Sequence, residues 1–182
     1  SEDQVKKNGE AFAEQAFRIL DEKKTSVRYN GEWLSELTLL DLIRLGQKFT
    51  IQQFLARENF SKRIDGGEPI FLHEMFYALM QGYDAVTMET DVQVGGSDQL
   101  FNIVVAGRKL QQALGQRPQI GIIMGILPGT DGVQRMSKTT GNHIPISTTP
   151  EDMYGKVMSV PDGAMLDYMR LLTSWKPDEI DD

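Results

Sequence analysis

A chain of 182 residues, 40% of them hydrophobic and 25% charged, is large enough for one globular domain with a sizeable core. The absence of cysteine excludes disulfides and thiolate metal sites, and a total of two histidines, His73 and His143, argues against a histidine-rich metal site. The net charge of −7 argues against nucleic-acid binding by this chain alone, and neither a secretory signal nor a membrane-spanning run is expected.

The N-terminal third is expected to be mainly helical. Residues 4–20 have apolar side chains at helical spacing, and the alternating segment 26–29 predicts a short strand. Thr38 is expected to begin the next helix, and Thr50, with a glutamine three residues later, has the capping-box pattern that begins another. The charged, glycine-containing residues 61–68 are expected to form a mobile loop.

The middle of the chain predicts one βαβ unit. Pro69 is expected to be the first residue of a helix, which carries the first candidate site described below. An alternating strand at 91–94 ends in two glycines, and Ser97 or Asp98 can cap the helix that follows. The nearly continuous apolar run 120–127 is typical of a strand buried on both faces, so these elements are expected to form a parallel crossover.

The C-terminal part is expected to be a loop followed by helices. Residues 128–147 are rich in proline, glycine, threonine and asparagine, and helices are predicted from Thr149, over 164–172 and from Pro177. The order of all these elements predicts an α/β fold. It is the closing half of a doubly wound, Rossmann-like parallel sheet, with helical connective and C-proximal segments.

Three polar side chains form a row on the helix that is expected to begin at Pro69. Tyr77, Gln81 and Asp84 are spaced so that they line one stripe, and the residues around them are apolar. A ligand with an ammonium group and a hydroxyl group would satisfy all three side chains if the helix is buried. The alternative, which the spacing alone favours, is that the row is the solvent-facing side of the helix.

A second candidate site follows the strand at 91–94. The segment 95–99 (Gly-Gly-Ser-Asp-Gln) combines glycines, which let a ligand approach the backbone, with the free N–H groups of a helix N-terminus. Ligands of doubly wound sheets bind at the carboxyl ends of strands, where this segment lies. The alternative is a tight turn followed by an ordinary N-cap.

The third candidate is the segment 135–139 (Arg-Met-Ser-Lys-Thr), which lies in a glycine-containing loop after the apolar strand. Two cations and two hydroxyl groups on a flexible loop suit a polyphosphate, and they can stabilise charge that develops as a phosphate leaves. The alternative is a solvated basic loop, with which a single pentapeptide of this kind is also compatible.

Taken in this order and at these spacings, the three segments closely resemble the tyrosyl-tRNA synthetases, which are class I aminoacyl-tRNA synthetases. The resembling residues are 77–84 (Tyr-Ala-Leu-Met-Gln-Gly-Tyr-Asp), 95–99 and 135–139, and the resemblance extends over nearly the whole chain, including 39–57 and 160–162. It implies the Rossmann-like, HUP-type catalytic domain of that family. The implied activity is ATP-dependent activation of tyrosine to tyrosyl-adenylate, followed by transfer to tRNA(Tyr).

The resemblance implies that the row on the first helix binds tyrosine. Tyr77 and Gln81 would hold the α-amino group, and Asp84 would accept a hydrogen bond from the phenol. Gln99 would face the carboxyl group and the activated intermediate. A buried carboxylate left unpaired is costly, so Asp84 would reject phenylalanine, which lacks the hydroxyl group.

The same resemblance assigns the other two segments to ATP. Asp98 would bind the ribose, with Gly96 allowing the backbone to approach closely. The loop segment resembles the class I signature Lys-Met-Ser-Lys-Ser, with Arg135 and Thr139 as conservative changes. Lys138 would stabilise the leaving pyrophosphate while the tyrosine carboxylate attacks the α-phosphate. The implied ATP-binding residues are Gly96, Asp98, Arg135, Met136, Ser137, Lys138 and Thr139, and the implied catalytic residues are Gln99, Arg135 and Lys138.

Cofactors and partners also follow from the resemblance. ATP is expected as a substrate that brings Mg²⁺, with no tightly bound cofactor and no dedicated metal site. Tyrosine, tRNA(Tyr) and a second copy of the chain are the other partners, because the helical segment 35–68 includes the region where the family forms its twofold interface. Neither DNA nor a membrane is expected as a partner, and the implied compartment is the cytoplasm or an organellar matrix.

The implied domain organisation is that of a fragment. Residues 1–145 would form part of the catalytic domain, and 146–182 a helical segment after the signature loop. The family's His-x-Gly-His motif is absent, since neither His73 nor His143 has that pattern around it. The half that carries this motif and the C-terminal tRNA-binding domain would lie outside this chain, so we expect the chain alone to be unable to activate tyrosine.

Two other interpretations stay open. Tryptophanyl-tRNA synthetase shares the fold and the chemistry, although Asp84 and the segment 95–99 have the tyrosine-type form. A non-catalytic dimerisation or RNA-binding module on a synthetase scaffold would keep the apolar segment 39–57. The acidic net charge weighs against RNA binding by the chain itself.

Overall fold

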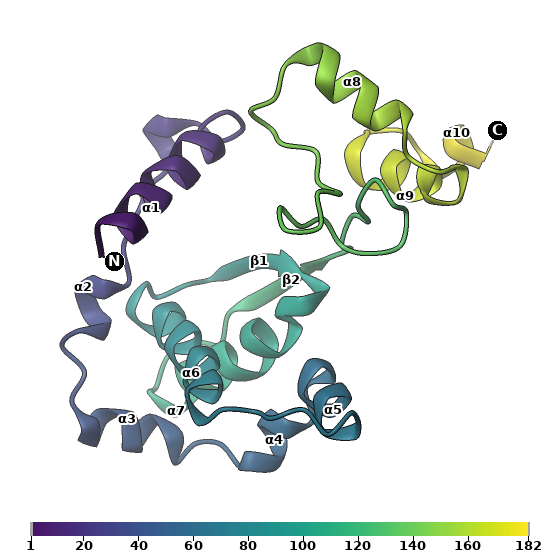
Figure 1. The fold of residues 1–182 in the computed structure, drawn as a ribbon. Coiled ribbons are helices and arrows are strands. Elements are labelled where there is room, and N and C mark those ends of the chain that lie inside the picture. Colours follow the sequence, from purple (N-terminus) through teal and green to yellow (C-terminus); the bar gives the residue numbers. More distant parts are fainter. Residues whose placement is uncertain (1, 182) are drawn as a thin grey trace. The chain divides into compact units, whose positions relative to one another are not determined.

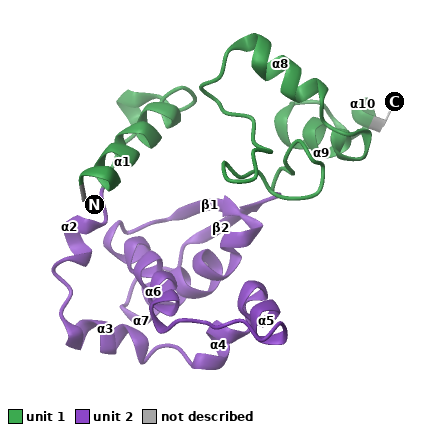
Figure 2. Ribbon diagram, viewed as in Figure 1, with its two compact units in different colours: residues 1–28, 126–182 green, residues 29–125 purple. Residues whose placement is uncertain are grey.

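The computed structural model describes residues 2–181, and the chain divides into two compact units (Figures 1 and 2). The sheet unit is Tyr29–Gly125, and the terminal unit combines Ser1–Arg28 with Ile126–Asp182. The predicted division into domains 1–145 and 146–182 concerns the whole enzyme and stays a prediction.

Short, capped helices begin the sheet unit. They are α2 (Gly31–Leu34), α3 (Leu39–Gly46) and α4 (Ile51–Leu55). Both helix starts predicted in this region are confirmed. Thr38 Oγ1 accepts a hydrogen bond from Asp41 N at 3.2 Å, and the Asp41 carboxylate accepts one from Thr38 N. Thr50 and Gln53 form the same reciprocal pair, which satisfies N–H groups that a helix start otherwise leaves unpaired.

The prediction of a mobile loop at 61–68 is wrong. Most of that segment belongs to α5 (Glu58–Asp65), and the two glycines that suggested a loop follow the helix. Phe60 is buried on the inner side of α5. On the outer side Lys62 Nζ contacts Glu58 Oε1, one turn earlier, at 2.6 Å. One buried aromatic side chain therefore holds a helix in a segment whose composition suggests a loop.

The central helix of the sheet unit is α6 (Leu72–Thr87). It begins at Leu72 rather than at Pro69, because Phe71 takes the N-cap position and its N–H donates to the Glu74 carboxylate at 2.9 Å. The buried side of α6 packs in two clusters. Ala78 and Leu79 pack with Phe54, Phe60 and Ala106, and Val86 packs with Leu45 and Leu110.

A parallel pair of strands follows α6. The strands are β1 (Val92–Gly96) and β2 (Ile120–Met124), and they pair from Val92 opposite Ile120 to Gly96 opposite Met124. The predicted crossover is therefore confirmed, but its helix has three parts. These are a 3₁₀ turn (Ser97–Gln99), a π-helix (Phe101–Gly107) and α7 (Arg108–Ala113).

Helices of the sheet unit cover one face of this sheet (Figure 1). Gly95 and Gly121 lie on that face, where an added Cβ would meet Ile103 of the π-helix at 2.6 and 2.9 Å. The opposite face is exposed and consists of Val92, Val94, Ile120, Ile122 and Met124. The prediction that the second strand is buried on both faces is therefore wrong, because no described element of the sheet unit covers this second face.

Two buried glutamines join β2 to the helices. Gln119 N donates to Gln111 Oε1 at 2.7 Å, and Gln119 Nε2 donates to Gln93 Oε1 at 2.7 Å and to the Ile103 carbonyl at 3.0 Å. Gln111 Nε2 donates in turn to the Thr90 carbonyl at 2.8 Å. These bonds satisfy buried polar groups at the start of β2, and they fix the position of the strand relative to the helices.

The terminal unit is helical apart from a long loop. Its elements are α1 (Glu2–Ala16), a 3₁₀ turn (Glu22–Lys24), α8 (Pro150–Met158), α9 (Asp162–Leu172) and α10 (Pro177–Asp181). The helices predicted from Thr149 and Pro177 are confirmed, and α1 ends four residues before its predicted end. Residues 26–29 form no strand, since no described residue pairs with them. Across residues 2–181, every helix is too short or too polar to cross a bilayer.

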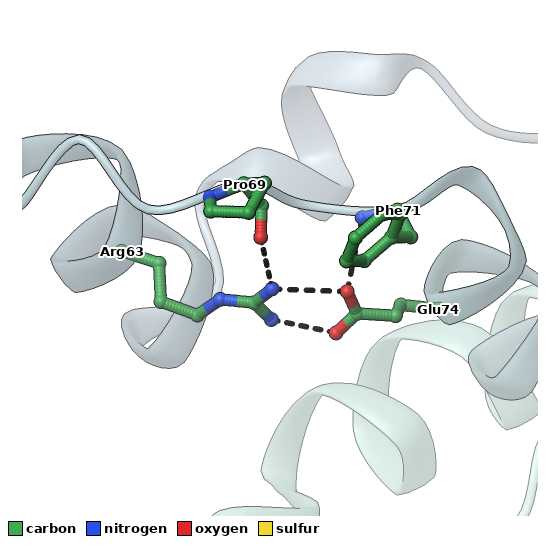
Figure 3. A network of polar contacts seen from close by, with 4 residues as sticks. All are labelled: Arg63, Pro69, Phe71 and Glu74. Atoms are coloured by element: carbon green, nitrogen blue, oxygen red, sulfur yellow. Dashed lines mark hydrogen bonds and ion pairs between the residues drawn. The ribbon is translucent and has the colours of Figure 1, made fainter.

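A polar network joins the end of α5 to the start of α6 (Figure 3). The Arg63 guanidinium contacts the Glu74 carboxylate at 2.6 Å (Nη1–Oε2) and 3.0 Å (Nη2–Oε1), and it also donates to the Pro69 carbonyl. The hydrogen bond from Arg63, followed by that from the Phe71 backbone, lowers the pKa of Glu74 from 4.5 to about 2. Glu74 is therefore ionised at every pH at which the chain is normally handled.

We predict that this network stabilises the fold only while Glu74 is ionised. Because its pKa in the folded chain is depressed from 4.5 to about 2, the stabilisation is present above pH 4.5 and is lost as the pH falls toward 2. Glu74→Gln should therefore lower the thermal unfolding midpoint at neutral pH, with a difference from wild type that shrinks over that range, measured by circular dichroism. Glu58→Gln, which removes the exposed pair with Lys62, is the control; an equal effect at neutral pH would contradict the prediction.

Candidate active site

The predicted row of Tyr77, Gln81 and Asp84 lies on α6 between the buried face of the helix and its exposed face. Tyr77 is 55% exposed, and Gln81 and Asp84 are half-buried. The row is therefore neither part of the core nor fully in solvent. A ligand can therefore approach these side chains from the solvent, while residues of the sheet unit contact Gln81 and Asp84 from the other side.

Two side chains from the start of the sheet unit hold the Asp84 carboxylate. Trp33 Nε1 donates to Asp84 Oδ1 at 2.8 Å, and Asn30 Nδ2 donates to Asp84 Oδ2 at 3.2 Å. Both donors are neutral, so they orient the carboxylate and leave its charge available to a further donor. The sequence did not identify Asn30 and Trp33, because they lie 54 and 51 residues from Asp84 along the chain. Their spacing of three residues at α2 indicates only that the two side chains share one side of that helix.

One buried asparagine connects the row with the segment after β1. Asn102 is 1% exposed, and its Nδ2 donates to Gln81 Oε1 at 2.9 Å and to Gln99 Oε1 at 3.0 Å. Gln81 and Gln99 belong to separate motifs in the sequence, and the fold brings them to one site. Sequence reasoning missed Asn102, since a single asparagine in an apolar helix has no local feature that identifies its partners.

The end of β1 places Gly96, Asp98 and Gln99 at the carboxyl edge of the sheet. The prediction that Ser97 or Asp98 caps the following helix is wrong, because Gly96 and Leu100 occupy the N-cap positions and no side chain caps either helix. Gln99 Nε2 donates to Asp98 Oδ2 at 3.2 Å. The Asp98 side chain is exposed, so its carboxylate is accessible to a ligand.

The third candidate segment lies in the terminal unit. Arg135, Lys138 and Thr139 are exposed, whereas Met136 packs against the apolar core of this unit. Arg135 also pairs with Pro128 through an isolated antiparallel bridge across the loop. The segment is thus anchored by its methionine and its backbone, and its cations face solvent, where they suit an anionic ligand.

Asn142 holds this loop together from within. Its Oδ1 accepts hydrogen bonds from Ser137 N and from Thr140 Oγ1, both at 2.8 Å. Its Nδ2 donates to the Asp131 carboxylate and to the Arg135 carbonyl, the latter at 3.2 Å. Sequence reasoning missed Asn142 because an asparagine after a glycine in a loop is as typical of a plain turn.

Asp131 is the anionic end of that network. Its carboxylate accepts from Val133 N at 2.8 Å and from Gln134 N at 2.7 Å, as well as from the Asn142 amide. The Val133 backbone bond, followed by the Asn142 and Gln134 bonds, lowers the pKa of Asp131 below its ordinary value. The carboxylate therefore stays ionised at neutral pH and closes the turn that precedes Arg135.

The two units carry charged candidate groups of opposite sign. The sheet unit supplies the carboxylates of Asp84 and Asp98, and the terminal unit supplies the cations of Arg135 and Lys138. In the part of the chain that the structure describes, no three side chains of the metal-binding types gather to hold an ion.

The sequence matches one known family along its whole length. Residues 1–182 match the family described as class I tRNA synthetases (W and Y), those for tryptophan and tyrosine. The chain belongs to this family. The resemblance stated from the three motifs is thereby confirmed.

Curated proteins similar to this synthetase chain are named tyrosine–tRNA ligases. The protein from Carboxydothermus hydrogenoformans is 52% identical over 94% of this chain and 42% of its own length. The protein from Thermotoga maritima is 47% identical over 100% of this chain and 45% of its own length. The chain thus spans less than half the length of these relatives.

Solved synthetase structures share the fold. A crystal structure of tyrosyl-tRNA synthetase from Archaeoglobus fulgidus with L-tyrosine matches with a TM-score of 0.68 and 25% identity, over 89% of this chain and 53% of that one. A C-terminally truncated mitochondrial tyrosyl-tRNA synthetase from Coccidioides posadasii matches with a TM-score of 0.54 and 22% identity, over 84% and 46%. The predicted Rossmann-like fold class is confirmed, with β1 and β2 as part of its parallel sheet.

We predict that Asn142 holds the loop around residues 131–142 in its observed conformation. Asn142→Ala removes the acceptor of the Ser137 N–H and one of the three donors to the Asp131 carboxylate, so the turn loses hydrogen bonds at both ends. Deuterium exchange of the amides at 130–140 should therefore become faster, measured by mass spectrometry. Asn8→Ala, on the exposed surface of α1 in the same unit, is the control, and an unchanged loop in Asn142→Ala would refute the role.

Proposed function

We propose that this chain is part of a tyrosine–tRNA ligase, which activates tyrosine with ATP and transfers it to tRNA(Tyr). The observation that carries the proposal is the Asp84 carboxylate, which Trp33 and Asn30 orient at the end of the row formed with Gln81 and Tyr77. The names of proteins 47% and 52% identical to the chain point to the same amino acid. We place the activity in the cytoplasm or in an organellar matrix.

Selection of tyrosine depends on its hydroxyl group. The phenol donates a hydrogen bond to Asp84, the ammonium group binds at Tyr77 and Gln81, and the carboxylate lies near Gln99. Phenylalanine offers no donor to Asp84, and the carboxylate is already held by two neutral donors. Binding phenylalanine therefore excludes water from a charge without replacing the lost hydrogen bond, which is the costly case for a buried polar group.

Activation is an in-line displacement at the α-phosphorus of ATP. A tyrosine carboxylate oxygen bonds to the α-phosphorus, the bond to the bridging oxygen of the β-phosphate breaks, and pyrophosphate leaves with that oxygen. Asp98 binds the ribose, and Gly96 lets the backbone approach it. Arg135 and Lys138 stabilise the charge on the pyrophosphate, supported by Met136, Ser137 and Thr139.

Transfer to tRNA completes the reaction without a covalent enzyme intermediate. A ribose hydroxyl at the end of tRNA(Tyr) attacks the tyrosyl carbonyl of the adenylate, and AMP leaves. Mg²⁺ enters with ATP and neutralises part of the phosphate charge. The contribution of the chain is positioning and electrostatic stabilisation, with Gln99 placed at the carboxyl group that reacts in both steps.

A second copy of the chain is the proposed protein partner. The outer face of α3 and the start of α4 expose four large apolar side chains, while Leu42 and Leu45 of α3 pack inward. The exposed residues are Leu39, Leu40, Ile43 and Ile51. Exposed apolar side chains of this kind are typical of a twofold interface, in which the same patch contacts itself.

Isothermal titration calorimetry with tyrosine and phenylalanine tests the amino-acid site. We expect the chain to bind tyrosine and to bind phenylalanine far more weakly, by about 10⁴-fold in sites that read a hydroxyl group. Asp84→Ala should remove this preference, and Trp33→Phe, which removes one donor to the carboxylate, should reduce it. Asp91→Ala, an exposed carboxylate at the start of β1, is the matched control; equal binding of both amino acids by wild type would refute the proposal.

Sedimentation equilibrium tests the proposed dimer. Wild type is expected to sediment as a dimer at micromolar concentration, and Ile43→Lys as a monomer, because a lysine ammonium cannot be buried without a partner. Leu114→Lys, at an exposed position at the end of α7, should leave the dimer intact. A wild-type monomer, or an Ile43→Lys dimer of equal strength, would contradict this interface.

A further inference from the structure

Three side-chain amides form a hydrogen-bonded chain that ends at a carboxylate. Gln99 Nε2 donates to Asp98 Oδ2 at 3.2 Å, Asn102 Nδ2 donates to Gln99 Oε1 at 3.0 Å, and the same Asn102 Nδ2 donates to Gln81 Oε1 at 2.9 Å. Asn102 is at the start of the π-helix, a conformation that is rare and often found at functional sites. Its two N–H groups are thus both used, one on each glutamine.

The carboxylate determines the orientation of every amide in this chain. An ionised carboxylate can only accept, so Gln99 turns its N–H toward Asp98 and its carbonyl toward Asn102. Asn102 must then present Nδ2 to Gln99, and the same nitrogen meets the carbonyl of Gln81. Asp98 therefore determines the orientation of the Gln99 amide, Gln99 that of Asn102, and Asn102 that of Gln81.

Burial keeps Asn102 from turning over. As it lies, its Nδ2 is fully used and its buried Oδ1 has no partner. The opposite orientation would place two N–H groups where no acceptor is available. It would also bring Oδ1 against the carbonyl oxygens of both glutamines, unless these turned over as well and Gln99 gave up its bond to Asp98. Buried N–H groups without a partner are rarer than buried carbonyl oxygens without one, so the orientation found is the more stable one.

We propose that Asn102 is a positioning residue for the amino-acid end of the tyrosine site, an inference that rests on the proposed function. A carbonyl oxygen has two lone pairs, so Gln81 Oε1 can accept from Asn102 and still accept from the ammonium group of tyrosine. Asn102 itself is 1% exposed and does not reach a ligand. It acts through Gln81, by keeping the carbonyl rather than the N–H of Gln81 in place for the ammonium group.

Asn102→Leu tests this role, since leucine has a similar volume and no hydrogen-bonding group. Without the donor, the Gln81 amide turns freely and presents its N–H to the ammonium group for part of the time. We expect tyrosine to bind about tenfold more weakly, the loss expected from one misplaced hydrogen bond. Binding of 3-(4-hydroxyphenyl)propionate, which lacks the amino group, should be unchanged, measured by calorimetry on the full chain.

The matched control is Gln119→Leu, which removes another buried amide of the sheet unit that contacts neither Gln81 nor Gln99. It should lower the thermal unfolding midpoint and leave the ratio of the two affinities as in wild type. An equal loss of both ligands in Asn102→Leu would overturn the positioning role, because general loosening of the unit does not distinguish the amino group.

A second measurement does not depend on ligand binding. In ¹⁵N-resolved NMR spectra of the chain without ligand, the side-chain amide signals of Gln81 and Gln99 should shift in Asn102→Leu, and that of Gln47, an exposed glutamine of the same unit, should not. Unchanged Gln81 and Gln99 signals would overturn the inference. If wild type binds neither ligand, the proposed tyrosine site fails, and the NMR result still decides whether Asn102 orients Gln81.

Discussion

Two residues without side chains let a helix lie directly on the sheet, and the candidate site depends on this close approach. An added Cβ at Gly95 or Gly121 would meet Ile103 at 2.6 or 2.9 Å, so any other residue there would push the π-helix away from β1 and β2. Because Ile103 is fixed in this space, the residue before it, Asn102, lies within hydrogen-bonding distance of Gln81 and Gln99. The carbonyl of Ile103 also accepts from Gln119, which ties the same helix to the start of β2.

The elements that were predicted correctly are those decided by neighbouring residues. Thr50 and Thr149 each cap a helix through a backbone N–H three residues later, so the side chain and its partner appear together in the sequence. The crossover from β1 to β2 was predictable for a similar reason, since an alternating strand, a helical stretch and an apolar strand follow one another directly. The three site motifs were found because each is a short run of consecutive residues or lies on one helical stripe.

The missed features depend on partners far away along the chain. The α5 helix is stabilised by burial of Phe60, which nothing between residues 58 and 65 reveals. Whether β2 is buried on one face or on two depends on which elements cover the sheet, and the run of apolar residues is the same in both cases. Trp33 and Asn142 have ordinary neighbours in sequence, and their roles come from contacts with Asp84 and with Asp131. Single polar residues that orient other polar residues therefore escape a search for motifs.

The indole of Trp33 makes the carboxylate of the candidate site optically observable. The chain has two tryptophans, and Trp33 and Trp175 belong to different units, so the replacement of Trp175 leaves one indole, hydrogen-bonded to Asp84 and excited selectively at wavelengths that tyrosine does not absorb. The emission of an indole depends on the charge and the hydrogen bonding at its nitrogen. A molecule that brings a donor to Asp84 or excludes water from it therefore changes the fluorescence of the chain. Binding at this carboxylate can then be followed in real time without an attached label.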